Sequence, residues 1–282
     1  MNDHEQRFGG IGRLYGQKAF GLLKNAKVAV IGIGGVGSWT AEALVRTGLT
    51  DITLIDLDEV CISNTNRQIH ALDGNIGKSK AEAMKERMQL INPSVKVTTI
   101  VDFFTQSTAD EILSLDFDIM IDAIDSVDNK CLLIAECIRR QKALVTCGSV
   151  GGRIDPTQIR KADLNSTTND TLLRNVRKKL RKNHSIPAEG PLGVPAVFSL
   201  EIPVFPNAFG EVCAVREKGV NSRMDCSTGF GTATQVAGSL GFAAAAAAIE
   251  LFLRNHDYVH PTAKDARGEL KTQMDGRALS PE

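Results

Sequence analysis

Short apolar runs alternate with amphipathic stretches along the first half of the chain. The apolar runs are strand candidates, and they lie within residues 27–39, 51–56, 96–101, 117–122 and 143–148. Between them, residues 76–92 and 127–141 space their apolar positions as a helix does. Strands that alternate with helices predict an α/β fold of Rossmann-like type, with a doubly wound, mainly parallel sheet.

The second half of the chain follows a different pattern, which predicts an elaboration of the same fold. Residues 172–184 form a basic helix candidate, and the Pro-rich residues 186–206 are typical of loop and edge strand. Residues 229–249 carry no charge, but their small side chains and lack of flanking Lys and Arg clusters favour a buried helix over a membrane span. We interpret residues 1–255 as one domain and residues 256–282 as a polar, disordered tail.

Composition restricts the partners and the compartment. The 282 residues include 33 Lys and Arg against 33 Asp and Glu, so any polyanion must bind through a local patch. The six cysteines form no Cys-x-x-Cys pair, which indicates reduced thiols in a cytoplasmic protein rather than disulfides or a zinc site. The first residues, "MNDHEQRF", contain no apolar segment typical of a secretory signal.

A glycine-rich turn, "GIGGVGS", follows the first strand candidate and opens a helix. Its glycines are suited to a tight turn, to close approach of phosphates to the backbone and to close packing of helix on strand; they are Gly32, Gly34, Gly35 and Gly37. Asp56 lies at the end of the second strand, where a carboxylate that binds ribose belongs. This pattern alone is compatible with either NAD or ATP.

The polar groups after Asp56 favour ATP. A triphosphate that loses pyrophosphate needs cations and a metal to neutralise developing charge. Arg67 has a fork suited to phosphate oxygens, and Lys80 stands at a helix start. Asp125 follows the fourth strand, where it could hold Mg2+. An NAD enzyme would have no evident use for Arg67 and Lys80.

Four motifs resemble the adenylating domain of ubiquitin-activating-enzyme-like proteins. In order and spacing these are "GIGGVGS", "DLDEVCISNTNRQ", "GKSKA" and "DAIDSVDNK", and the resemblance spans about residues 7–255. It implies an enzyme that uses ATP to convert a carboxylate into an acyl-adenylate, with release of pyrophosphate.

The resemblance also implies roles for the matched residues. Asp56 would hold the ribose, and Gln68 would support the loop that carries the phosphate ligands. The expected triphosphate ligands are Asn64, Arg67 and Lys80, and the expected Mg2+ ligand is Asp125. Members of this family commonly form homodimers in which an N-terminal arginine reaches the partner's phosphates; Arg7 and Arg13 are both candidates.

Within this family, "RFGGIGRLYG" and "MDCSTGFGTAT" resemble the branch that dehydrates threonylcarbamoyladenosine in tRNA. The resemblance implies a tRNA substrate, an intramolecular cyclisation and a link to a cysteine desulfurase system. Some relatives also bind Na+ or K+. One basic run would suit phosphate contact, and its cations are Arg174, Arg177, Lys178, Lys179, Arg181 and Lys182. The apolar seam expected on this helix is Leu172, Val176 and Leu180.

Alternative functions remain open at this point. An enzyme that adenylates a ubiquitin-like sulfur carrier would share the site, although such enzymes typically have the two Cys-x-x-Cys pairs that this chain lacks. A non-catalytic scaffold would bind partners without Arg67. Cys226 is a candidate acyl-accepting thiol, but an intramolecular cyclisation needs no external nucleophile.

Overall fold

A seven-stranded sheet organises the part of the chain that the structure describes. The computed structural model describes residues 2–207, 209–215 and 230–258. The sheet has the strand order β3-β2-β1-β4-β5-β7-β6, and a two-stranded hairpin, β8-β9, lies outside it. The strands are β1 Lys27–Ile31, β2 Asp51–Ile55, β3 Lys96–Ile100, β4 Ile119–Asp122, β5 Leu144–Cys147, β6 Ile159–Asp163, β7 Pro195–Ser199, β8 Phe205–Pro206 and β9 Val212–Cys213.

Six strands of the sheet are parallel, which confirms the predicted doubly wound fold. Strand β1 lies between β2 and β4, so that Val28 is in register with Ile52 of β2 and Ile119 of β4. Strand β6 alone runs antiparallel, against β7. Residues 186–206 were expected to form loop and edge strand, and β7 departs from this: it lies between β5 and β6, and β6 forms the edge of the large sheet. Residues 186–194 are loop, and β8 is one strand of the two-stranded hairpin. Pro195 is tolerated because it is the first residue of β7.

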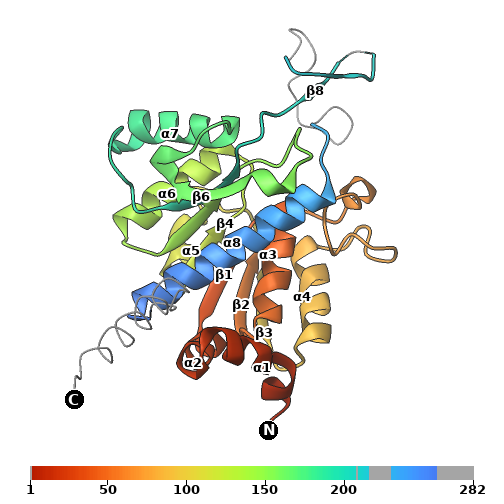
Figure 1. Cartoon of the computed structure of the whole chain (residues 1–282), viewed down its shortest axis with the longest axis vertical. Helices are drawn as coiled ribbons and strands as arrows, with labels where there is room; N and C mark the ends of the chain where they lie inside the picture. Colours follow the sequence, from red (N-terminus) through yellow and green to blue (C-terminus); the bar gives the residue numbers. More distant parts are fainter. Residues whose placement is uncertain (1, 208, 216–229, 259–282) are drawn as a thin grey trace, which may run out of the picture.

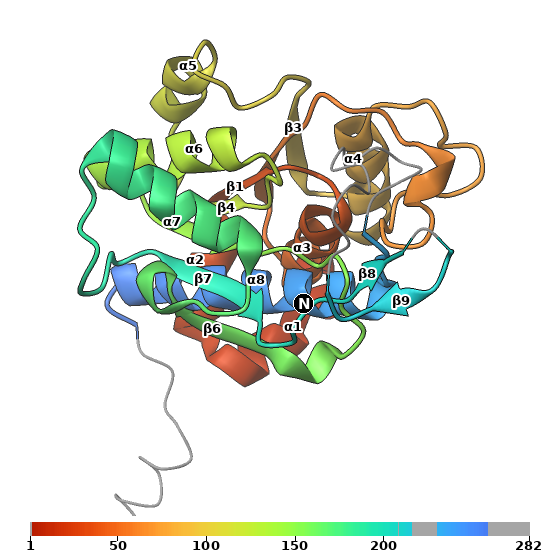
Figure 2. The same cartoon turned by 90° about the horizontal axis from the view of Figure 1, so that it is seen from above.

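Helices cover both faces of this sheet and form two hydrophobic cores. Figure 2 shows α6 and α7 on one side and α8 on the other. One core packs α2, α3, α4 and α8 against side chains such as Val28 and Leu54, and the other packs α5, α6 and α7 against Ala29 and Met120. The helices are α1 Asp3–Tyr15, α2 Gln17–Asn25, α3 Gly35–Arg46, α4 Lys80–Ile91, α5 Ala109–Ser114, α6 Val127–Arg139, α7 Thr171–His184 and α8 Thr234–Asn255.

Helix α8 is the uncharged segment that could be mistaken for a membrane span. Among the described residues it is the one helix long and apolar enough to cross a bilayer, yet 67% of its most apolar stretch is buried inside the protein. It packs closely on α3, where Thr40 Oγ1 donates to the carbonyl of Gly241 at 3.1 Å and Trp39 meets Phe242 edge-on. The prediction of a buried helix is confirmed.

The first residues after α8 lie on the body of the protein. His256 Nδ1 is 2.9 Å from the carbonyl oxygen of Phe252, and the Tyr258 hydroxyl donates to the carbonyl of Tyr15. The predicted tail begins at residue 256, so its first residues continue from α8 with contacts from His256 and Tyr258, and residues 259–282 lie outside the described residues.

Candidate nucleotide site and basic helix

The carboxyl ends of β1, β2, β4 and β5 place four connecting segments at one edge of the sheet (Figure 1). The strand order reverses between β1 and β4. In open α/β sheets, ligands bind at this edge where the order reverses. The segments that follow these strands are therefore where a ligand is expected.

The segment after β1 is the glycine-rich turn. Gly32 has a φ of +89°, and its N–H donates to the carbonyl of Ile55 at 2.9 Å. Gly34 caps α3 and supplies no side-chain hydrogen bond to the helix. The first amides of α3 are therefore available to an anion, which the positive end of the helix dipole also attracts.

Gly37, in the first turn of α3, approaches the backbone of this turn. A Cβ atom at Gly37 would overlap the carbonyl oxygen of Gly32. A Cβ at Gly32 would in turn lie 2.9 Å from the backbone of Ala123, which follows β4. The two glycines thus allow the segments after β1 and β4 to touch.

Asp56, directly after β2, fixes the turn from the other side. One of its carboxylate oxygens accepts from the amide of Ile33 at 2.5 Å, and the other accepts from the amide of Asp58 at 2.8 Å. Burial raises the pKa of Asp56, while the charge of Lys80 and these two amides act to lower it. Asp56 therefore joins the end of β2 to the glycine-rich turn after β1, which we call the phosphate turn.

The polar loop after Asp56 folds back over the glycine turn. Asn64 is buried. Its side-chain Oδ1 accepts a hydrogen bond from the backbone amide of Cys61 at 3.0 Å and so closes the loop. A Cβ at Gly35 would lie 3.4 Å from Cγ of Arg67, and one at Gly34 would lie 4.0 Å from Nε2 of Gln68. Trp39 Nε1 holds this loop through the carbonyl of Arg67 at 3.0 Å.

The two side chains nearest the turn retain bonding capacity. The guanidinium of Arg67 donates to the carbonyl of Ser63 at 2.8 Å and to Oδ1 of Asn66 at 3.0 Å. Within residues 2–207, 209–215 and 230–258, no carboxylate lies within ion-pair distance of Arg67, and the buried Oε1 of Gln68 has no hydrogen-bond partner. A further ligand could engage both groups.

Lys80, the first residue of α4, points back toward the end of β2. Its ammonium group lies 2.7 Å from Oδ2 of Asp58, and its side chain is 9% exposed against 52% for Asp58. The charge of Lys80 also reaches Asp56 and His70, because it acts on the pKa of both. The structure thus brings Lys80 to the same edge as the glycine turn.

Asp125 lies in the segment 123–126 that joins β4 to α6, and it is exposed. The segment is tied to β1, since the amide of Ala123 donates to the carbonyl of Ile31 at 2.9 Å. The described residues contain no group of three or more His, Cys, Asp or Glu side chains that could enclose a metal. Mg2+ is often bound by one carboxylate together with phosphates and water, which suits Asp125.

Helix α1, with both candidate arginines, lies at the opposite edge of the sheet (Figure 1). His4 Nε2 is 2.7 Å from the carbonyl oxygen of Gly48, in the turn that precedes β2. Arg7 forms an ion pair with Asp3 at 2.7 Å, while Arg13 has no carboxylate partner among the described residues. The structure therefore brings neither arginine to the nucleotide site of its own chain.

Helix α7 divides its basic residues between two environments. Arg177 is half-buried and donates to the carbonyl of Leu164 at 3.3 Å and to the hydroxyl of Thr167, and burial lowers its pKa. Lys179 pairs with Asp128 of α6. These two cations therefore anchor the helix.

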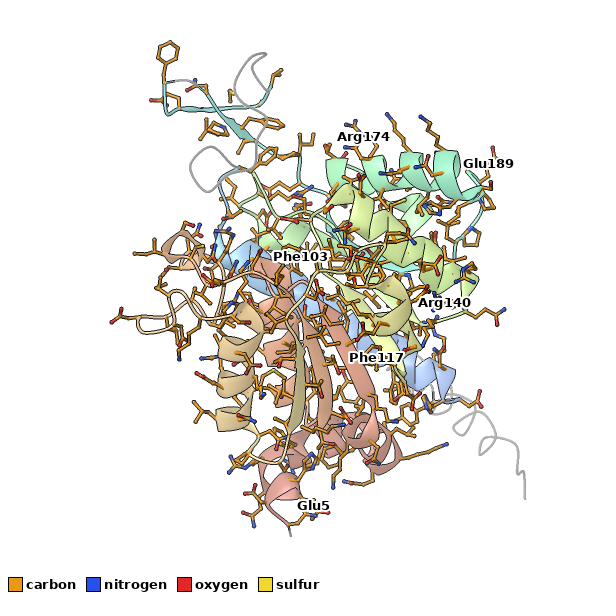
Figure 3. The ribbon with its side chains drawn as sticks, turned by 180° about the vertical axis from the view of Figure 1, so that it is seen from behind. Glu5, Phe103, Phe117, Arg140, Arg174 and Glu189 are labelled. Atoms are coloured by element: carbon orange, nitrogen blue, oxygen red, sulfur yellow. The ribbon has the colours of Figure 1, made fainter. Side chains whose placement is uncertain are left out.

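The exposed cations of α7 form a line, which we call the basic stripe: Arg174, Lys178 and Lys182. Their spacing of four residues places them on one side of the helix, and Figure 3 shows Arg174 pointing outward. Arg181 is also exposed and donates to the carbonyl of Ala188 at 3.1 Å. The fully buried seam consists of Leu173, Val176 and Leu180, which confirms Val176 and Leu180; Leu172 packs against the same core but is only partly buried, and Leu173 takes the buried position.

The described cysteines include no activated thiol in the core. Cys131, Cys137 and Cys147 are buried, and burial raises their pKa values to about 11, about 12 and about 12. A thiol must lose its proton to act as a nucleophile. Cys226 lies outside the described residues.

Sequence reasoning missed a set of buried polar residues beneath the site. Lys130 and Asp122 form an ion pair of 2.8 Å with side chains that are fully buried. His70 is fully buried, and neither ring nitrogen has a partner. Lys130 could have been noticed, because it interrupts the apolar face of α6 between Val127 and Cys131. The sequence around His70 offers no comparable signal.

The fold and this edge define a nucleotide-binding α/β protein with a glycine-rich turn, an arginine that has no carboxylate partner among the described residues, and a lysine. A family model described as "ThiF family" matches residues 11–268, and the chain belongs to that family. The resemblance to adenylating domains is thereby confirmed.

The family relatives include enzymes of known name. The chain is 50% identical to the tRNA threonylcarbamoyladenosine dehydratase of Escherichia coli, over 87% of this chain and 92% of that protein. It is 44% identical to the Haemophilus influenzae protein of the same name, over 90% and 96% of the two chains.

Solved structures agree with these relatives. The E. coli dehydratase TcdA in complex with ATP matches with a TM-score of 0.80 and 45% identity, over 90% of this chain and 96% of that one. The complex of TcdA with AMP matches with a TM-score of 0.79 and 44% identity, over 90% and 97%. E. coli MccB, at 19% identity, shares the fold with a TM-score of 0.57.

Gly37→Ala should disrupt the turn, because the new methyl group would meet the carbonyl of Gly32. We expect a loss of unfolding free energy of about 2–4 kcal/mol, in the range of other overpacked or strained sites, and loss of nucleotide binding. Gly21→Ala in α2 is the matched control, since nothing lies within 4 Å of its added Cβ. Denaturant unfolding and nucleotide calorimetry check both, and equal stability of the two variants would contradict the prediction.

His70 should make the protein sensitive to acid. Burial, Lys80 and Arg87 lower the pKa of His70 from 6.5 to about 4, so below pH 6.5 the unfolded chain binds a proton that the folded chain does not. Stability is therefore lost as the pH falls from 6.5 to about 4, by up to about 3 kcal/mol. His70→Leu should lack this component. The unfolding free energies of parent and variant should be measured from pH 8 to pH 4.5. Their difference should be constant above pH 7, and below pH 6.5 the parent should lose stability relative to the variant.

Proposed function

We propose that this protein is an ATP-dependent tRNA threonylcarbamoyladenosine dehydratase. The observation that carries the proposal is the likeness to the E. coli dehydratase over nearly the whole of both chains. The turn, Arg67, Lys80 and Asp125 gather at one sheet edge, which supports the use of ATP. With a tRNA substrate and reduced thiols, the cytoplasm is the expected compartment.

The residues present fit ATP. The uncapped start of α3 offers amides to phosphates, and the missing side chain at Gly35 leaves space beside Arg67. We assign the ribose to Asp56 and the triphosphate to Asn64, Arg67 and Lys80, with the buried amide of Gln68 supporting the loop. Asp125 would hold Mg2+, which would neutralise charge on the phosphates.

The reaction would activate the threonyl carboxylate of the modified adenosine. A carboxylate oxygen attacks the α-phosphorus of ATP, and the bond to pyrophosphate breaks. A heteroatom of the same side chain then attacks the activated carbonyl, a ring closes and AMP leaves, so the net change in the nucleoside is the loss of one water. Because the second step is intramolecular, the protein mainly has to orient the substrate, and no cysteine nucleophile, including Cys226, is required.

The dimer and the remaining partners rest on the family resemblance. Since α1 lies far from the nucleotide edge of its own chain, an arginine of α1 could act only on a second copy. Arg13 suits this role better than Arg7, because Arg7 is already paired with Asp3. A Na+ or K+ site and a cysteine desulfurase partner are proposed from the resemblance alone.

The decisive experiment incubates the protein with ATP and tRNA that contains threonylcarbamoyladenosine, and analyses the nucleosides by mass. We expect loss of one water from that nucleoside, with AMP and pyrophosphate formed in equal amount. An enzyme for a ubiquitin-like sulfur carrier would instead leave the tRNA unchanged and consume ATP only with a carrier. Unmodified tRNA should support no turnover.

Arg67→Ala, Lys80→Ala and Asp125→Ala should each lower turnover by about 100-fold or more. Arg67 and Lys80 would neutralise the developing phosphate charge directly, and Asp125 would do so through the Mg2+ that it holds. The expected cost to thermal stability is small for Arg67 and Asp125, whose side chains are at least partly exposed. Arg139→Ala is the control, as it removes an arginine with a 64% exposed side chain that pairs with Glu136 in α6. Parent-like kcat in all three site variants would overturn the assignment.

Neutralising the basic stripe, by Arg174→Gln, Lys178→Gln and Lys182→Gln, should weaken tRNA binding. If each cation contacts a phosphate, the plot of the logarithm of the tRNA association constant against the logarithm of the salt concentration should become less steep by about 2–3 units. A matched triple of exposed cations elsewhere serves as the control: Lys96→Gln, Arg139→Gln and Arg254→Gln. Filter binding at several salt concentrations measures both. If the two triple variants show the same salt dependence, the basic stripe does not contact tRNA.

A further inference from the structure

Beneath the segment that carries Asp125 lies a buried ionic cluster that the proposed function does not yet use. It consists of Asp122, the last residue of β4, Thr146 in β5 and Lys130 in the first turn of α6. All three residues are fully buried. They come from three elements that meet directly below residues 123–126.

Every proton of the Lys130 ammonium group has an acceptor. Its nitrogen lies 2.8 Å from Oδ2 of Asp122, 3.2 Å from Oγ1 of Thr146 and 3.3 Å from the carbonyl oxygen of Asp122. The Thr146 hydroxyl itself donates to Oδ2 of Asp122 at 2.7 Å. A buried ammonium group requires this full set of acceptors, since an unpaired buried charge would lower the stability of the fold by several kcal/mol.

The cluster acts on the segment above it. The second carboxylate oxygen of Asp122 accepts from the amide of Ile124 at 3.1 Å. At the other end, the backbone amide of Lys130 donates to the carbonyl of Ser126 at 2.9 Å, which is the first hydrogen bond within α6 and does not involve the Lys130 side chain. Both bonds hold residues that directly flank Asp125, on either side. The segment is therefore held by the cluster at its start, through the Asp122 carboxylate, and by the first turn of α6 at its end.

A further set of backbone contacts joins residues 123–126 to the phosphate turn. The amide of Ala123 donates to the carbonyl of Ile31, and Gly32 packs against the backbone of Ala123. The exposed carboxylate of Asp125 is thus carried on a short segment whose backbone is fixed to β1, β4 and α6. A metal ligand on a loop gains precision from such support.

We propose that the cluster of Lys130, Asp122 and Thr146 positions Asp125 for the divalent cation that accompanies ATP. The three are positioning residues, because Lys130 and Thr146 hold the Asp122 carboxylate, which in turn holds the amide of Ile124, and none of them acts on the phosphates. An ion pair serves this purpose better than an apolar contact, because its hydrogen bonds fix direction as well as distance. The inference rests on the assignment of Asp125 in the proposed function.

The variants must separate positioning from folding. Lys130→Met removes the charge, and because it leaves Asp122 buried and unpaired, it could unfold the protein. Thr146→Val is nearly isosteric and removes only the hydroxyl that bonds both Asp122 and Lys130. Thr146→Ser is the matched rescue, because it restores the hydroxyl.

Calorimetry with ATP alone, in EDTA and then with Mg2+, needs no tRNA and no turnover. We expect Thr146→Val, and Lys130→Met if it folds, to bind ATP in EDTA as the parent does. Both should need about 10- to 100-fold more Mg2+ to reach the tighter, Mg2+-dependent affinity, as is typical when a group behind a metal ligand is lost. Thr146→Ser should restore the parent Mg2+ dependence.

Two results would overturn the inference. One is an unchanged Mg2+ requirement in Thr146→Val, whatever happens to its melting temperature, which would make the cluster purely structural. The other is a parent whose ATP affinity does not depend on Mg2+. Failure of the proposed function looks different, because a protein that binds ATP and Mg2+ as expected but leaves tRNA unmodified would lose its substrate assignment and keep the positioning cluster.

Discussion

The buried carboxylate of Asp56 is the interaction on which the nucleotide site depends. Its two oxygens accept hydrogen bonds from the backbone amides of Ile33 and Asp58. These bonds hold the phosphate turn and the polar loop at one fixed separation. Burial disfavours the charged form, while the amides and Lys80 favour it. The ribose assignment adds a further role, since hydroxyl groups can still approach the remaining lone pairs of a carboxylate that already accepts two amides.

Around Asp56, the side chains that fix geometry are buried and those with free capacity are exposed. Lys130 and Asp122 are fully buried with every bond satisfied, whereas Arg67 is partly exposed and Asp125 is exposed. Gln68 and Lys80 are exceptions, because the Oε1 of Gln68 is buried without a partner and the side chain of Lys80 is only 9% exposed. The charges of Arg67 and Asp125 are therefore accessible to a ligand, whereas the buried charges of Lys130 and Asp122 are compensated within the protein by their own ion pair.

Local pattern in the sequence was enough to predict β1 to β5, the glycine turn and the buried α8, because strand and helix periodicity are properties of neighbouring residues. It could not predict that residues 159–163 form the edge strand, since β6 pairs with β7 across the intervening α7, between residues that are far apart in the sequence. The role of Arg177 was equally hidden. In sequence it belongs to a basic run, but in space it faces Leu164 and Thr167.

The elaborated second half of the chain gives the basic stripe a fixed place relative to the nucleotide edge. Asp170 caps α7 through the amide of Leu173 at 2.9 Å and also accepts from the amide of Ser149, just after β5, at 2.8 Å. Arg153 pairs with Asp170 at 3.4 Å, and both side chains are 1% exposed. The first turn of α7 is therefore tied to the same sheet edge as Asp125. A tRNA held along the stripe would lie at a set distance from the activated carboxylate, and such fixed placement is what an intramolecular ring closure requires of its enzyme.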